Sequence, residues 1–221
     1  MDKKTSLDKC VLIGNTLVDS LQQKVMLKEE LIELRKLKQN ENRQQILEDK
    51  IAEYEEYNES ILDFISYADL TGVDLSYSDL AGANLIYADL SYANLSHTDL
   101  TGANLNDANF NDANLRYADL KNTNLSYADL MKANLSYAWL FGANLNNADL
   151  SYADLSYADL SYADLKNADL TGANLNNADL SYANLSYADL TGANLSHTYL
   201  TGADLTGLNL STIKQKKPKL D

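Results

Sequence analysis

The 221-residue sequence has one cysteine, one proline and no long hydrophobic run. Cys10 is the one cysteine, so no intramolecular disulfide can form, which favours a reducing compartment. No stretch reaches the roughly 20 apolar residues of a membrane span. Asp8, Lys9 and Asn15 interrupt the apolar residues at the N-terminus, so no secretory signal is expected. These shortages together predict a cytoplasmic protein without a membrane anchor.

Positive charge is also scarce. Lys and Arg number 18 against 32 Asp and Glu, which gives a net charge of −14. Direct binding to nucleic acid is not expected, because Lys and Arg side chains hold phosphate backbones. The excess of acid fits a protein that repels its own kind or that meets a basic partner surface.

What the sequence has in abundance is one repeat of five residues. From Leu70 to Leu210 every fifth residue is Leu, with Phe110 the one exception, and no residue is inserted or deleted. Two positions before Leu stands a small residue, usually Ala, and between them stands Asp or Asn at all but two positions. Pairs such as Ser-Tyr, Thr-Gly or Asn-Asn follow each Leu.

A period of five suits neither regular element. On an α-helix the Leu side chains would encircle the rod, and on a flat strand they would alternate between faces. The chain therefore turns a corner in every repeat. Ala and Leu point inward from a short extended segment, Asp or Asn points outward, and the pair after Leu forms the corner.

The alternation of Asp and Asn fixes the number of sides. The residue before Leu is Asp in 11 of 15 positions whose numbers end in 9, and Asn in 10 of 14 positions whose numbers end in 4. This ten-residue alternation stays in register on a coil of 20 residues and is scrambled on a coil of 15. We therefore predict a four-sided coil, with about seven coils stacked at about 4.8 Å into a rod of roughly 35 Å.

The pattern Ala-(Asp/Asn)-Leu-X-X, as in Ala83-Asn84-Leu85-Ile86-Tyr87, resembles the pentapeptide-repeat family. The resemblance covers residues 66–210 and implies a right-handed quadrilateral parallel β-helix. The resemblance is much less specific for function, because this family hosts several unrelated roles on one fold.

The segments on either side of the repeats differ from them. Residues 1–65 lack proline and carry heptad-like apolar residues, so we predict an α-helical hairpin. It would cap the first coil or act as a coiled-coil dimerisation arm, and both alternatives stay open. Residues 211–221 form a basic tail that we expect to be loose. The N-terminal helices and the C-terminal coil are thus two routes to a homodimer.

The sequence predicts no catalytic, cofactor-binding or metal-binding residues, and hence no enzyme. His97 and His197 lie 100 residues apart, or five coils, so they cannot share a metal ion, and we interpret both as corner residues. Every glycine of the repeats is a corner residue rather than part of a phosphate-binding loop.

Two columns of Asp are predicted on opposite sides of the coil. We expect stacked carboxylates to repel and to raise one another's pKa. The columns are either a solubilising surface or an imitation of DNA phosphates. One column contains Asp69, Asp89, Asp129, Asp149, Asp169 and Asp189, and the other contains Asp79, Asp99, Asp119, Asp159 and Asp179.

Two other kinds of column are predicted to be structural. Asn84, Asn104, Asn124 and Asn144 should form a side-chain ladder, and the corner rings from Tyr77 to Tyr157 should stack on one another.

Aromatic residues break the repeat in two places. Trp139 and Tyr199 occupy positions of Asp or Asn, and Tyr137 and Phe141 flank Trp139. Because Trp and Tyr often anchor interfaces, these four residues are the candidate partner-binding site.

We therefore predict a non-enzymatic protein-interaction or scaffold protein that binds an unidentified protein partner. The alternative follows from the resemblance to the family's gyrase-protecting members, which imitate DNA and bind type II topoisomerases. Such members carry loops that project from the coils, and the repeat here is unbroken.

Overall fold

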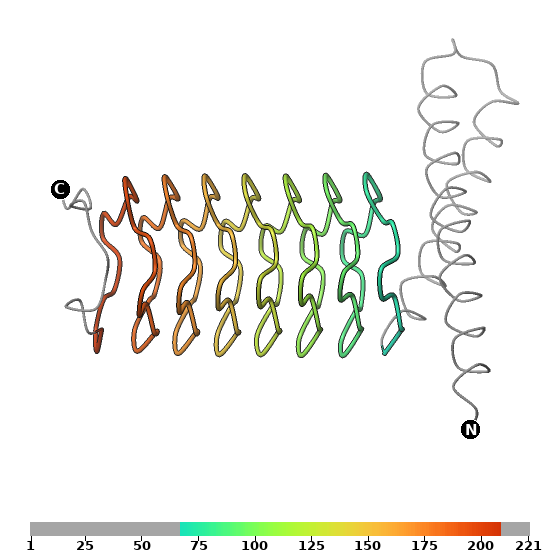
Figure 1. Cartoon of the computed structure of the whole chain (residues 1–221), viewed down its shortest axis with the longest axis horizontal. Coiled ribbons are helices and arrows are strands. Elements are labelled where there is room, and N and C mark those ends of the chain that lie inside the picture. Colours follow the sequence, from blue (N-terminus) through green and yellow to red (C-terminus); the bar gives the residue numbers. More distant parts are fainter. Residues whose placement is uncertain (1–66, 209–221) are drawn as a thin grey trace, which may run out of the picture.

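The computed structural model describes residues 67–208. The predicted N-terminal hairpin over 1–65 and the basic tail over 211–221 lie outside these residues. The described chain winds into a stack of regular coils, a right-handed four-sided β-helix (Figure 1).

Each coil takes 20 residues, as the alternation of Asp and Asn predicted. Residue i pairs with residue i+20 in parallel bridges, from Asp69 with Asp89 to Asn184 with Asp204. Every side contributes a single bridged residue per coil. Residues 67–208 therefore contain no helix and no strand longer than one bridged residue. The resulting register places residues 20 apart directly on one another.

The core consists of the inward Ala and Leu side chains. Leu90, Phe110 and Leu130 form one column and are fully buried. Burying a Leu side chain stabilises a fold by about 1.5–3 kcal/mol, and the repeat does this on every side of every coil. Thr98 and Thr198 replace Ala in this core, and the hydroxyl of each donates to a leucine carbonyl oxygen 2.8 Å away.

The corners are tight turns with a common backbone conformation. The N–H of the residue three positions after each Leu donates to that Leu carbonyl, as from Ala93 to Leu90 at 3.0 Å. The second residue after each Leu has a positive φ at every corner from Tyr67 to Gly207, as in type II turns. Tyr, His, Asn, Asp and Lys occupy this position as well as Gly.

The remaining backbone donors explain why Asp or Asn precedes Leu. Along one repeat, Asn109 N donates to Ala88 O of the preceding coil at 2.9 Å, and Leu90 N donates to Asn109 O of the following coil at 2.7 Å. The N–H just after Leu has no such backbone partner. It donates instead to the Oδ1 of the Asp or Asn two positions earlier, as Ser91 does to Asp89 at 3.0 Å. Only a short side chain with an acceptor oxygen can satisfy this donor.

Candidate functional site

The four sides of the β-helix differ in the residue that they present to solvent. Two opposite sides are acidic, and the bridges stack Asp on Asp, as for Asp149 and Asp169 on one side and Asp159 and Asp179 on the other. The two sides between them carry mostly Asn. The structure thus separates acidic sides from amide sides, as the sequence predicted.

The amide sides contain hydrogen-bonded ladders. Asn124 Nδ2 donates to Asn104 Oδ1 at 3.0 Å, and Asn144 Nδ2 donates to Asn124 Oδ1 at 3.1 Å. The predicted Asn ladder is therefore confirmed for these three coils. Asn124 and Asn144 each accept a hydrogen bond from their own turn and donate one to the preceding coil.

At Asp189, on one acidic side, hydrogen bonds lower the pKa, whereas the sequence led us to expect stacked charges to raise it. The pKa of Asp189 lies below its usual value because the side chain and the backbone N–H of Thr191 both donate to its carboxylate. The same contacts from the residue two positions on lower the pKa of Asp74 and of Asp204. The expectation of a raised pKa is thus wrong for Asp189, because it left out these donors.

One corner carries a continuous ring stack. Tyr77, His97, Tyr117, Tyr137 and Tyr157 stack with ring centroids 4.7–5.0 Å apart, which confirms the predicted column. His97 is one ring of this stack. Across residues 67–208 no group of three or more His, Cys, Asp or Glu is placed to hold a metal ion.

Trp139 lies in the middle of one acidic side. Its backbone keeps the regular register, with bridges to Asp119 and Asp159, and its side chain is 52% exposed. Lys121 Nζ lies 4.3 Å from the Trp139 ring centroid and 2.9 Å from the Asp119 carboxylate. Lys121 therefore neutralises Asp119 and makes a cation–π contact with Trp139.

The two corners beside Trp139 are also aromatic. Tyr137 is half-buried in the ring stack, and Phe141 is 41% exposed. The Phe141 ring packs at 5.4 Å against Tyr162 of the following coil. We call Tyr137, Trp139 and Phe141 together the Trp139 patch.

Tyr199, the fourth predicted residue, is exposed on the same side but three coils farther on, about 14 Å at strand spacing. Asp159 and Asp179 lie between Tyr199 and Trp139. The structure therefore brings together three of the four predicted residues.

Sequence analysis missed Arg116 and Lys121, the cations of the coil before the Trp139 patch. The Arg116 guanidinium carbon lies 4.8 Å from the Tyr117 ring centroid and 5.4 Å from that of Tyr137. They could have been found from the sequence, because residues 67–208 hold four Lys or Arg in all and these two lie at consecutive corners.

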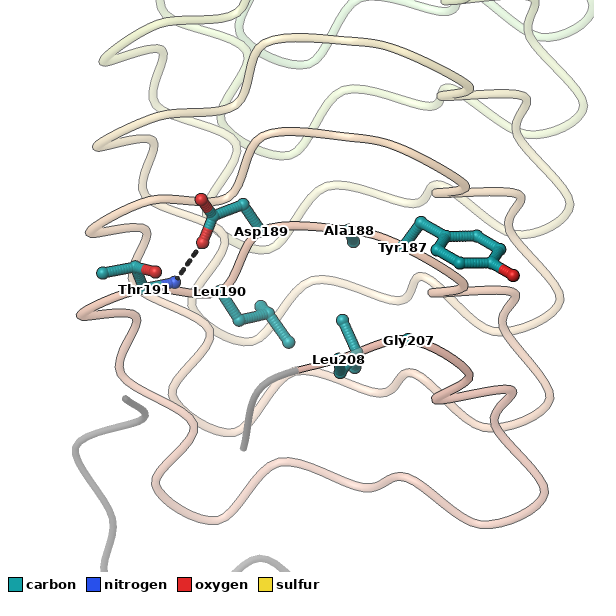
Figure 2. A pocket seen from close by; sticks show the side chains of 7 residues that line it. All are labelled: Tyr187, Ala188, Asp189, Leu190, Thr191, Gly207 and Leu208. Carbon is teal, nitrogen blue, oxygen red and sulfur yellow. Dashed lines mark hydrogen bonds between the residues drawn. The ribbon is translucent and has the colours of Figure 1, made fainter. Parts of the chain in front are cut away.

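A pocket of about 370 Å³ lies where the described coils end (Figure 2). Seven residues line it: Tyr187, Ala188, Asp189, Leu190, Thr191, Gly207 and Leu208. Asp189 accepts a hydrogen bond from Thr191 N at 2.8 Å beside it. The residues that would stack on Asp189 and Leu190, 20 positions later, fall beyond residue 208. The pocket therefore lies at the end of the described β-helix and is not our candidate site.

Within residues 67–208 there is no helix long and apolar enough to cross a membrane.

Comparison with known proteins gives a consistent result. The family model described as pentapeptide repeats matches this chain in overlapping segments between residues 68 and 213. No curated protein sequence matches it.

Three solved structures illustrate the likeness. HetL, a pentapeptide repeat protein involved in heterocyst differentiation regulation from Nostoc sp. strain PCC 7120, is 35% identical over 70% of this chain and 86% of its own, with a TM-score of 0.24. Rfr23, a pentapeptide repeat protein from the cyanobacterium Cyanothece 51142, is 34% identical over 51% of this chain and 64% of its own, with a TM-score of 0.34. QnrB1, a plasmid-mediated fluoroquinolone resistance protein, is 22% identical over 72% of this chain and 87% of its own, with a TM-score of 0.46.

Proposed function

Because this chain belongs to the pentapeptide-repeat family, we propose that it is a non-enzymatic binding protein, a rigid scaffold that contacts a protein partner through the Trp139 patch. The family alone does not select this role, since one fold hosts many functions. The proposal depends on the site.

The observation that carries the proposal is Trp139 itself. Asp or Asn fills 26 of the 28 bridged positions from residue 69 to residue 204 and accepts a hydrogen bond from the N–H two residues on. Trp139 has no acceptor oxygen for Phe141 N, and half of its side chain faces solvent. Residues that break a local rule without a gain in stability mark functional sites. Exposed Trp is also among the commonest anchors of protein interfaces.

Trp139→Asp tests the proposal. We expect the variant to fold, because Asp restores the acceptor for Phe141 N although it adds a carboxylate between Asp119 and Asp159. Binding to the partner should fall by tenfold or more, about 1.4 kcal/mol or above. The measurement compares the proteins retained by immobilised wild type and variant, followed by the affinity of any protein that only the wild type retains.

Tyr92→Asn is the matched control. It removes another exposed aromatic side chain, at a corner that does not border the side of Trp139, and Asn occupies such corners at Asn147 and Asn167. Tyr92→Asn should retain the same proteins as the wild type. Equal retention by Trp139→Asp would refute the Trp139 patch as the contact surface.

A second candidate, imitation of DNA at a topoisomerase, is favoured by the acidic sides. Residues 67–208 hold 17 Asp and four Lys or Arg. Their net charge of −13, spread over roughly 35 Å, gives about one negative charge per 2.7 Å of axis. Duplex DNA carries one per about 1.7 Å. The rod thus has somewhat more than half of the linear charge density of DNA.

A DNA gyrase supercoiling assay, with and without a quinolone, separates the two candidates. The DNA-mimic function predicts inhibition or drug protection that weakens as salt rises. The scaffold function predicts unchanged supercoiling even with protein well in excess of gyrase.

A further inference from the structure

The surroundings of the Trp139 patch are not symmetric along the β-helix axis. In the preceding coil, Lys121 pairs with Asp119, and Arg116 adds a second positive charge at the other corner. In the two following coils, Asp159 and Asp179 occupy the same side. One edge of the patch is therefore basic and the other acidic.

The acidic edge has unused acceptors. Asp159 Oδ1 accepts from Ser161 N at 3.0 Å and from Ser161 Oγ at 2.5 Å, and Asp179 Oδ1 accepts from Ser181 N at 2.9 Å. Among residues 67–208, no Lys or Arg forms an ion pair with Asp159 or Asp179, whereas Asp119 has Lys121. Oδ2 of each carboxylate remains to receive a cation from a partner.

The opposite acidic side has exposed tyrosines at its corners, such as Tyr127 and Tyr152, but no aromatic residue in its bridged column. Asp129, Asp149, Asp169 and Asp189 follow one another there, and no aromatic residue interrupts the column. The same stacked charge thus occurs twice on the molecule, but next to an exposed Trp only once. A partner that recognises both features binds one side.

We infer that the Trp139 patch binds an extended basic segment of a partner protein, with a large apolar side chain on Trp139 and Lys or Arg side chains on Asp159 and Asp179. This inference rests on the proposed function and adds the chemistry of the partner. Asp159 and Asp179 lie about 4.8 and 9.6 Å along the axis from Trp139. At about 3.3 Å per residue of extended chain, these distances correspond to about 1.5 and 2.9 residues, so long cationic side chains two and three residues from the apolar anchor can reach the two carboxylates.

Trp139 is the one tryptophan of the chain, so its fluorescence reports directly on this site. The probe is the synthetic peptide Gly-Phe-Gly-Lys-Lys-Gly, titrated into the full chain at low salt. We expect a saturable change in Trp139 emission. Two comparison peptides should bind at least about fivefold more weakly, one with Ala for Phe and one with Glu for both Lys.

Two double variants test where the cations bind. Asp159→Asn with Asp179→Asn should weaken binding of the Lys peptide about fivefold, as expected for two exposed ion pairs. Asp149→Asn with Asp169→Asn makes the same charge change on the opposite side and should leave affinity within about twofold. Asn keeps the Oδ1 acceptor and is common at the bridged positions of the other two sides, so both variants should fold.

Three results would overturn the inference: no saturable change with the Lys peptide, unchanged affinity in the Asp159/Asp179 variant, or equal weakening in both variants. The last would show that charge acts over the whole rod. None of these results removes the Trp139 patch as a contact surface, because that fails only if Trp139→Asp retains the natural partner.

Discussion

Asp and Asn at the bridged position accept the same hydrogen bond, but only Asn can also donate one to the preceding coil. Either side chain accepts a hydrogen bond from the N–H two residues on, as Asp149 does from Ser151 and Asn124 from Ser126. Asn can also donate to the residue 20 positions earlier, and ionised Asp cannot. Amide columns therefore form ladders between coils, whereas acidic columns stack like charges.

Exchanging the two residues should change stability in opposite directions. Asn124→Asp removes the donor to Asn104 Oδ1 and should lower the free energy of unfolding by about 1 kcal/mol. Asp169→Asn gains a donor to Asp149, as Asn109 has to Asp89 at 3.0 Å on the same side, and should raise that free energy by about 0.5–1 kcal/mol. Urea unfolding of both variants measures the difference.

The effect of Asp169→Asn should shrink as salt is added, because part of it is relief of charge repulsion. Loss of stability in Asp169→Asn would show that neighbouring acidic residues do not destabilise the stack.

At the scale of the single element, the corner determines what each repeat tolerates. Every corner holds its second residue at positive φ, which most side chains adopt only at a cost. The size of the residue at a corner is also limited where the side chain 20 residues earlier lies over that corner. Tyr152 lies over Gly172, where an added Cβ would stand 2.8 Å from its ring, whereas Gly192 has open space.

Gly172→Ala and Gly192→Ala therefore form a matched pair. Both place Ala at positive φ, which costs about 1–2 kcal/mol. Gly172→Ala should cost about 1 kcal/mol more, because the Tyr152 ring must move. Thermal or urea unfolding of both variants gives the difference. In a Tyr152→Gly background, which reproduces the open space that Gly192 has 20 residues after Gly172, the two substitutions should become equal, and a difference that persists there would contradict the assigned contact.

Much of the element could be predicted from sequence. The five-residue period of Leu70 to Leu210 indicated a corner in each repeat, and the corner glycines and the ring stack from Tyr77 to Tyr157 follow the same register. The hydrogen bond that each bridged Asp or Asn accepts from the N–H two residues on was not predicted. Its signal was the near restriction of one position to Asp and Asn, which outward exposure alone does not explain. The wrong direction for the pKa of Asp189 has the same cause.

At the scale of the whole molecule, stacking converts a one-dimensional repeat into sides with distinct chemistry. Trp139, Tyr137 and Phe141 could be grouped from sequence because they are close along the chain. The contact of Lys121 with Trp139 depends on side-chain conformation as well as register, and it was missed for that reason. We propose that Asp159 and Asp179 bind cationic side chains of the partner. The sequence assigned them to the correct side as members of a column but did not connect them with Trp139.

The register of 20 residues places every column and the Trp139 patch, and engineered disulfides test it most directly. In a Cys10→Ser background, Asp149→Cys with Asp169→Cys puts two thiols on bridged residues about 4.8 Å apart, within the range of a disulfide. Asp149→Cys with Asp164→Cys joins residues 15 apart, which a three-sided coil would stack. Mild oxidation should close the first pair and leave both thiols of the second free for labelling. Closure of the second pair with the first left open would contradict the four-sided register and everything built on it.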